Sequence, residues 1–297
     1  MILSPAEKDY LYQSLSQPQI VRPDARAVHQ YRPLEATTSF LPGSNGSARI
    51  RLSDGSECIV SVKSKVVTSA KSASTSTTAR PQLIDVDIDI VGIRDDSNYV
   101  ANLRYQLLNL LQQNFPHEAL RLTSRYAFKL FIDCIIISHS PYPLGLISFA
   151  TYLALKTTKL PALISDVNDE EVAELPTFSD DWDNAQSVEE LMREKQLGSS
   201  FQPPILITIG IIGDNLIFDP SIEEEQVLEN GIIVSFYNGK VITPVMNTSF
   251  SSGGFKGFNK SLILKSVSLC NKYCPSITKA LDTLVNQDGE GAEGSIF

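Results

Sequence analysis

The segment from Lys129 to Leu155, KLFIDCIIISHSPYPLGLISFATYLAL, constrains the fold more than any other part of the chain. Two apolar runs flank a turn that contains proline, which predicts a buried strand, a sharp turn and a buried helix. In many α/β enzymes such a turn holds a phosphate or a catalytic group, because the first turn of a helix offers free N–H donors and the positive end of its dipole. Here the turn at 140–144 contains no acid, base or cation and no glycine-rich sequence. The turn that often binds phosphate or holds a catalytic group in other proteins therefore lacks the side chains for either role.

Strand-like and helix-like patterns alternate along the rest of the chain. Apolar alternation predicts strands at 83–92 and 128–138 and hairpins at 46–67, 205–219 and 231–244. Helical periodicity predicts helices at 97–114, 146–157 and 261–285, and Ser4 and Pro5 predict the start of an N-terminal helix. The order of elements repeats in the halves 1–160 and 161–285. We therefore expect one α+β sandwich over 1–285, with internal pseudo-duplication of sheet-plus-helix halves.

Three segments fall outside this pattern. Residues 68–81 consist mainly of Ser, Thr and Ala, which predicts a flexible loop because they cannot bury enough apolar surface to become ordered. Residues 166–202 are strongly acidic with weak periodicity and are expected to form a solvated insertion. Within it, Trp182 and nearby Phe178 suggest a place where a partner docks. Residues 286–297 are expected to be a disordered tail.

Two groups of side chains raise the question of a metal site. The aspartates of strand 83–92 share one face, but an exposed face of a sheet explains them better. Cys270 and Cys274 lie four residues apart, without further Cys or His ligands at matching spacing. We therefore expect reduced cysteines and no metal or cofactor. His139 is the one candidate acid or base beside the turn, and the sequence provides no carboxylate to orient it.

The distribution of charge changes what the total implies. The net charge is −9, but residues 1–165 carry +4, residues 166–195 carry −9 and residues 196–297 carry −4. The N-terminal half could contribute a local positive field to a polyanion, although binding shared with other subunits is easier to support than binding by this chain alone. Neither a membrane-spanning run nor a signal peptide is predicted, so we expect a soluble protein that is not secreted.

An ordered set of motifs points to a family. The chain contains RPDAR (22–26), RPLE (32–35), GSA (46–48) and VSVK (60–63), and later DPSIEEE (219–225). The first four resemble the opening of the RNase PH family. The last resembles a signature of its non-phosphorolytic branch, the ring subunits of the eukaryotic RNA exosome. The resemblance covers about residues 4–285 outside the Ser/Thr loop and the acidic segment, and it implies an RNase PH-like sandwich.

Most of these motif residues are expected to organise the fold. Arg22, Asp24 and Arg26 can form salt bridges at the first strand, and the acids after Asp219 can stabilise a following helical turn. Ala25 stands where relatives carry Gly, so we expect no positive φ at this position.

The resemblance also assigns a phosphate site, which active members build from a Gly-Ser/Thr-Arg turn at a helix N-terminus. In this chain the turn corresponds to Tyr142, Pro143 and Leu144, which predicts a degenerate phosphate site because the proline lacks a donor and the leucine cannot bind phosphate. The catalytic aspartates of active relatives correspond to positions near Gln196 and Gln202, neither of which titrates. We therefore predict that the chain is not an enzyme by itself.

The resemblance implies a role in RNA processing and decay within an exosome core. The expected partners are other RNase PH-like subunits (a heterodimer, then a six-membered ring), S1/KH caps, an associated hydrolytic exoribonuclease and RNA, in the nucleus, nucleolus and cytoplasm. Candidate RNA contacts are Lys65, Arg94 and Arg104, although ordinary surface salt bridges also explain them. Two alternatives stay open: a phosphorolytic 3′-5′ exoribonuclease that shares an active site with a partner, and a ring spacer without RNA contact.

Overall fold

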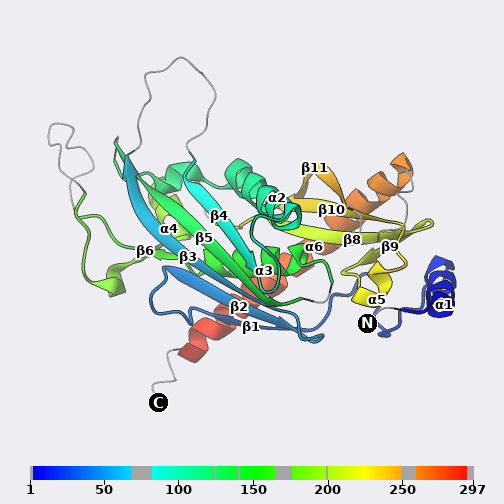
Figure 1. The fold of residues 1–297 in the computed structure, drawn as a ribbon. Helices are drawn as coiled ribbons and strands as arrows, with labels where there is room; N and C mark the ends of the chain where they lie inside the picture. The colour runs from blue at the N-terminus through cyan, green and yellow to red at the C-terminus, as the bar shows by residue number, and fades with distance from the viewer. Residues whose placement is uncertain are drawn as a thin grey trace.

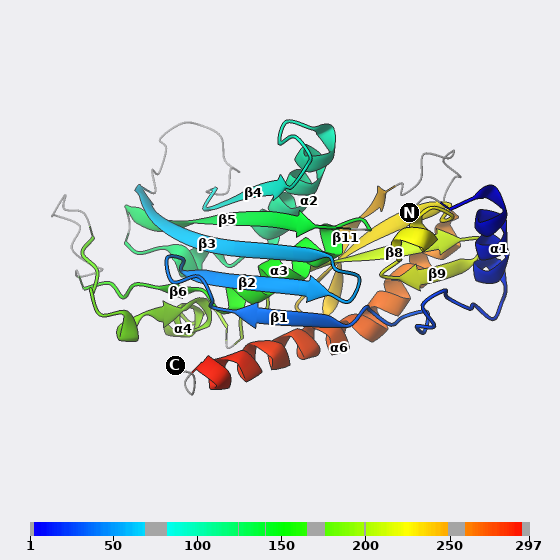
Figure 2. The same ribbon diagram turned by 60° about the horizontal axis from the view of Figure 1, so that its bottom comes forward.

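The computed structural model describes residues 3–68, 82–123, 125–139, 141–164, 176–198, 200–248 and 259–292. Two β-sheets form the body of the molecule, and helices pack behind and between them (Figures 1 and 2). The predicted Ser/Thr loop, apart from Thr68, lies outside the described residues. Within the part of the chain that the structure describes, no helix is both long and apolar enough to cross a membrane.

The N-terminal half is built on a five-stranded sheet with strand order β1-β2-β3-β5-β4. Its neighbours are antiparallel except for β4 and β5, which are parallel and joined by a helical crossover. The strands are β1 (Leu34–Thr38), β2 (Gly46–Leu52), β3 (Glu57–Thr68), β4 (Ile84–Ile90) and β5 (Tyr126–Ser138). The crossover consists of α2 (Asn98–Asn114), which the Ser97 side chain caps, and the short helix η1 (His117–Leu120).

The C-terminal half contains a four-stranded antiparallel sheet with order β11-β10-β8-β9. Its strands are β8 (Ile205–Ile212), β9 (Asn215–Phe218), β10 (Asn230–Tyr237) and β11 (Lys240–Thr248). The helical turn α5 (Ile222–Glu225) connects β9 to β10, and the long helix α6 (Lys260–Ala292) follows β11. Helix α1 (Pro5–Ser16) covers one end of this sheet, where Leu11 and Leu15 pack with Ile212 and Ile217. The predicted pair of sheet-plus-helix halves is confirmed.

Helix α3 (Leu144–Lys156) lies at the centre of the molecule, in contact with both sheets and α6. Every residue from Leu146 to Leu155 is buried, as expected for a helix that is apolar on all sides. Strand β2 approaches α3 closely at Gly46, where an added Cβ would lie 2.5 Å from the Ala154 carbonyl oxygen. The GSA motif therefore begins with glycine because strand and helix leave no room for a side chain.

The acidic segment differs from its prediction. Residues 176–198 are built into the fold through η2 (Trp182–Asn184), β7 (Gln186–Ser187), which pairs with β6 (Lys159–Leu160), and α4 (Val188–Glu194). Val188, Leu191 and Met192 are buried, so the acids occupy the outer face of an amphipathic helix. The Phe178 ring packs against Phe128 at 5.5 Å. The sequence pattern did not predict this helix, because its apolar face consists of only three residues within a strongly acidic segment.

Lys195 attaches this segment to the first half. Its ammonium group donates to the carbonyl oxygens of Glu118, Ala119 and Arg121 at the end of η1. Burial lowers the pKa of Lys195. The chain end also differs from its prediction, since α6 continues to Ala292 and the helix therefore includes residues 286–292 of the expected tail.

A buried pair of charges joins the two halves. The Arg22 guanidinium binds Glu224 through two hydrogen bonds of 2.7 Å, and both side chains are fully buried. The remaining Arg22 N–H groups donate to backbone carbonyls, including those of Phe218 and Asp219. Glu224 also caps α5, because its carboxylate accepts from the Ser221 N–H. All the donors of this arginine are thus used to hold the N-terminal segment against β9 and α5.

A second cluster of charges surrounds Asp219. Its carboxylate accepts from Arg32 and Arg26, and Arg32 also binds Asp54. Burial alone would raise the pKa of Asp219, but the hydrogen bonds and charge of Arg32 outweigh it and hold the pKa below its ordinary value. The predicted structural role of the RPDAR and DPSIEEE motifs agrees with these contacts.

The prediction for Ala25 is wrong. Its φ is 58°, in the left-handed region that favours glycine. A turn hydrogen bond from the Ala25 N–H to the Arg22 carbonyl and the ion pairs of its neighbours hold the backbone there. Long-range contacts thus impose a conformation that the residue type alone disfavours.

Breaking the buried pair should destabilise the chain strongly. We expect Arg22→Ala to lower the free energy of unfolding by about 3–5 kcal/mol, because it leaves the Glu224 carboxylate buried without its partner. Urea denaturation measures this loss. Arg49→Ala is the control, since Arg49 is half-exposed and its pair with Glu57 should contribute about 1 kcal/mol or less. An equal loss of unfolding free energy in both variants would contradict the claim that the buried pair contributes more to stability than the exposed pair.

The close contact between Gly46 and α3 gives a second prediction. Gly46→Ala should lower the free energy of unfolding by about 1–3 kcal/mol, because the new methyl group meets backbone atoms of α3. Gly43→Ala is a matched control, since nothing lies within 4 Å of the added atom, and its effect should stay within about 0.5 kcal/mol. Thermal unfolding of the two variants checks the difference.

Candidate functional site

The turn before α3 lies beside a small cavity. Tyr142 and Pro143 line it, together with Tyr31, Arg32 and His139. The space open to the centre of a water-sized sphere is about 20 Å³, which is room for about one water. Leu144 is fully buried in the core and does not line the cavity. The structure therefore brings two of the three predicted residues to one site and turns the third away from it.

Few backbone donors remain at this turn. Pro141 and Pro143 have no N–H, and Pro143 provides no side-chain cap for α3. The Tyr142 N–H donates to the Glu225 carboxylate at 2.8 Å. The donor that could have faced an external anion is thus taken by an acid of the chain itself.

Glu225 is the functional residue that sequence reasoning missed. Burial raises its pKa from 4.5 to about 8, partly offset by the Tyr142 N–H and Arg32. Tyr142 also makes an edge-on ring contact with Tyr99 at 6.1 Å between centroids. In the sequence, Glu225 is marked only as the third acid of the DPSIEEE motif. Its neighbour Glu224 binds Arg22.

The other polar groups of the cavity are held by structural bonds or lack partners. Arg32 is occupied by Asp219 and Asp54, so its guanidinium is not free for an anion. The Tyr31 hydroxyl and the His139 Nδ1 are buried without a hydrogen-bond partner among the described residues. Burial raises the pKa of Tyr31 well above its ordinary value. This set of groups provides no combination of base, nucleophile and phosphate cradle.

The positions that correspond to catalytic acids lie elsewhere. Gln196 is exposed in the turn after α4, Gln202 precedes β8, and neither lines the cavity. The acidic residues around Trp182 also lie apart, since Trp182 borders a different hollow, which is lined by residues 44–47, Thr157 and Lys159 among others. The aspartates of β4 are exposed, and two of them pair with Lys129 and Arg104. Among the described residues, no group of three or more His, Cys, Asp or Glu side chains could hold a metal ion.

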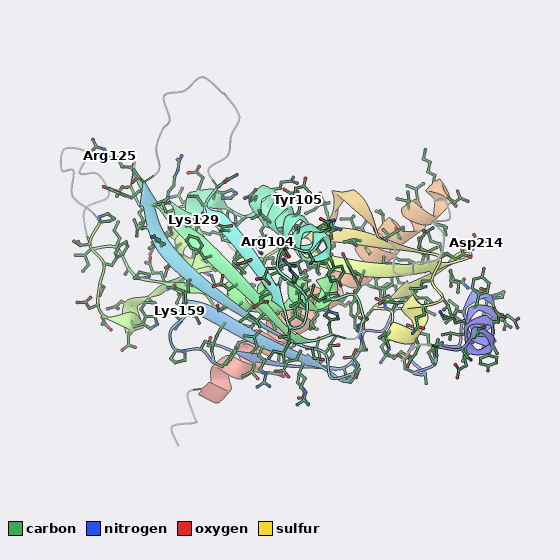
Figure 3. The ribbon with its side chains drawn as sticks, viewed as in Figure 1. Arg104, Tyr105, Arg125, Lys129, Lys159 and Asp214 are labelled. Carbon is green, nitrogen blue, oxygen red and sulfur yellow. The ribbon has the colours of Figure 1, made fainter. Side chains whose placement is uncertain are left out.

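The three candidate RNA contacts lie on different elements of the N-terminal half and do not form one cluster. Lys65 lies near the end of β3, opposite Lys129 on β5. Arg104 (Figure 3) reaches from α2 to Asp87 on β4. Arg94 follows β4 and pairs with Asp96. Lys65 is the only one of the three without an ion pair among the described residues.

Comparisons with known proteins agree with this fold. The family model described as the 3′ exoribonuclease family, domain 1, matches residues 30–161, and domain 2 of the same family matches residues 202–252. The chain belongs to the 3′ exoribonuclease family. The predicted RNase PH-like sandwich is thereby confirmed.

Two curated relatives are exosome subunits. Exosome complex component RRP42 of Saccharomyces cerevisiae is 40% identical over 96% of this chain and 100% of its own length. Exosome complex component rrp42 of Schizosaccharomyces pombe is 29% identical over 77% of this chain and 76% of its own. The likeness to the RRP42 type of ring subunit extends along almost the whole chain.

Solved structures share the fold at low identity. A chain of an archaeal exosome core matches with a TM-score of 0.64 and 16% identity, covering 93% of this chain and 96% of that one. A chain of the Archaeoglobus fulgidus exosome with RNA bound to the active site matches with a TM-score of 0.65 and 16% identity, covering 93% and 97%.

The proton on Glu225 gives a prediction for pH dependence. Because its pKa is raised in the folded state, the stability linked to this proton is present below about pH 4.5 and is lost as pH rises towards about 8. Glu225→Gln keeps the acceptor for Tyr142 but cannot ionise. We expect wild type to lose a few kcal/mol relative to the variant between pH 5 and 9. Urea denaturation across this range checks it, and parallel curves would contradict the assignment.

Proposed function

We propose that this chain is a non-catalytic ring subunit of an exosome core, which helps to form a channel that guides RNA to an associated 3′-5′ exoribonuclease. The observation that carries the proposal is the turn before α3, where two prolines remove donors and Glu225 takes the Tyr142 N–H. Likeness to an exosome complex component along 96% of the chain supports the assembly. The chain keeps the strand, helix and domain pair of its family without the groups that bind phosphate.

In the proposed assembly, this chain forms a heterodimer with another RNase PH-like subunit. Three such dimers form a six-membered ring. S1/KH subunits would cover one face, and a hydrolytic exoribonuclease would receive the RNA. The proposed locations are the nucleus, the nucleolus and the cytoplasm, where RNA processing and decay occur. Stability of the fold, with its two halves locked by Arg22 and Glu224, suits a scaffold that must hold its neighbours in place.

The contribution to RNA binding is proposed to be electrostatic. Lys65 and its neighbour Lys63 place positive charge at one end of the five-stranded sheet, where Lys129 opposite Lys65 is paired with Asp85. Such charges attract the phosphodiester backbone without reading bases. Arg94 and Arg104 contribute less, because Asp96 and Asp87 already neutralise them.

Catalytic inertness can be tested directly. A purified heterodimer of this chain with an RNase PH-like partner should release no nucleoside diphosphate from RNA when inorganic phosphate is added, because two prolines remove donors from the turn and Glu225 takes the Tyr142 N–H. Thin-layer chromatography of labelled products measures this. Phosphate-dependent release would instead support an active site shared with the partner.

RNA guidance can be tested in the assembled ring. Reversal of charge at Lys65, Arg94 and Arg104 together should shorten the RNA segment protected from added nuclease and lower RNA affinity, with Lys65→Glu giving the largest single effect. Lys240→Glu, an exposed change at the β10–β11 turn, is the control and should leave protection unchanged. An unchanged footprint in the triple variant would favour a spacer without RNA contact through these residues.

A further inference from the structure

Helix α6 lies along an outer border of the molecule, from the four-stranded sheet past β1 (Figure 2). Its buried side, which includes Leu262, Cys270, Cys274 and Leu281, packs against the body. The other side faces solvent, and its charge differs from that of the chain as a whole. Residues 260–281 contain four lysines and no acid, although the chain carries a net charge of −9. A positively charged helix thus lies on the surface of an acidic protein.

Three of these lysines form one line along the exposed side, here named the lysine stripe: Lys265, Lys272 and Lys279. They follow one another at intervals of seven residues. Seven residues are close to two helical turns, so the lysines share one face and are separated by about 10 Å at each step. Ser268 and Ser276 are exposed between them, and their hydroxyl groups are hydrogen-bond donors. The stripe therefore presents a row of cations and donors about 21 Å long.

The lysine stripe is not neutralised by the part of the chain that the structure describes. None of its ammonium groups makes an ion pair with a described residue, whereas Lys129 and Lys156 do. Asp282, three residues beyond Lys279, is the first acid after the stripe. Its carboxylate accepts from the Tyr152 hydroxyl and pairs with Lys156, both of which belong to α3. The three positive charges of the stripe are therefore available to a ligand.

The surroundings of the stripe leave its charge in place. Lys265 donates to the backbone carbonyl oxygen of Asp214 at 2.9 Å, and the Asp214 carboxylate (Figure 3) forms no ion pair with it. The Lys272 ammonium lies 5.1 Å from the centre of the Tyr273 ring, which packs against His29 at 4.6 Å. Burial lowers the pKa of His29, and the charges of Lys272 and Lys265 lower it further. At neutral pH the positive field at this place thus comes from the lysines.

The exposed side of α6 suits a polyanion better than an apolar partner. Among the described residues of α6, Leu264 is the only large apolar side chain that is exposed. The surface therefore lacks the clustered apolar and aromatic anchors on which protein–protein interfaces depend. A membrane surface would need an exposed apolar face beside the lysines, and the apolar face of α6 is buried against the body. Point charges and hydroxyl donors in a row are groups that bind a phosphodiester backbone.

We propose that the lysine stripe binds single-stranded RNA on the outside of the molecule, through its phosphates and without reading bases. This contact is separate from the candidate guide residues Lys65, Arg94 and Arg104, which belong to the N-terminal half. The choice of RNA as the polyanion rests on the proposed function. The stripe itself needs neither a channel nor a neighbour, because one helix of this chain carries all of it. RNA that has not entered a channel is thus held at this surface.

The test is crosslinking of the assembled ring with a circular single-stranded RNA that contains 4-thiouridine. A circular RNA has no end, so it cannot be threaded end-first through a channel. We expect ultraviolet light to link it to peptides that contain residues 265–279. Absence of these crosslinks would overturn the inference, while crosslinks of a linear RNA elsewhere on the ring would still support the proposed function.

Variants of the full chain measure the contribution of charge. Lys265→Gln, Lys272→Gln and Lys279→Gln together should weaken binding of the circular RNA at least about 10-fold at low salt. The slope of log affinity against log salt should fall by about 2, since each phosphate contact with a single strand contributes about 0.7. Fluorescence anisotropy measures both quantities. Polyglutamate of equal charge should displace the RNA at least about 10-fold less well, and equal displacement would overturn RNA as the ligand.

The matched control is a triple variant with the same change in net charge, Lys8→Gln, Lys159→Gln and Lys260→Gln. Lys260 lies on α6 itself, but on a different side of the helix from the stripe. The control should bind the RNA within about 2-fold of wild type. An equal loss in both triple variants would show that net charge alone attracts RNA, and the site would be overturned. Thermal unfolding close to that of wild type checks that both variants keep the fold.

Discussion

The rest of the structure depends on the buried pair of Arg22 and Glu224. The two residues are separated by 202 positions, and their charges are hidden from water. A buried ion pair contributes little net stability, because both ions lose their hydration on burial. It also requires one particular geometry of the two side chains. Its value lies in specificity. It requires the segment before β1 to lie against β9 and α5, and the two halves can therefore meet in only one way.

The same pair determines the state of the candidate site. Because Glu224 is anchored by Arg22 and by the Ser221 cap, its neighbour Glu225 is carried to the turn before α3. The cluster around Asp219 likewise occupies the guanidinium of Arg32, which lines the cavity. The contacts that join the halves therefore also place the Glu225 carboxylate where it accepts the hydrogen bond of the Tyr142 N–H. Two consecutive acids, Glu224 and Glu225, thus connect the contact between the halves with the turn before α3.

The two faces of the five-stranded sheet have different roles. The inner face packs against α3, whose residues from Leu146 to Leu155 are all buried. The outer face keeps apolar residues in solvent at the same end of the sheet as the altered turn, since β5 leads directly into it.

The sequence by itself determined the order of elements, the buried strand–turn–helix, the hairpins and the family, because local periodicity and turn residues report local structure. It also led to the prediction of a degenerate phosphate site at Tyr142, Pro143 and Leu144. It could not reveal that Leu144 turns into the core, that α4 is amphipathic within an acidic run, or that Ala25 adopts a positive φ. Only the tertiary structure decided these, and only it brought Glu225 to Tyr142 across 83 residues. The physical reason is that burial and long-range ion pairs are set by which segments meet, and no local pattern records that.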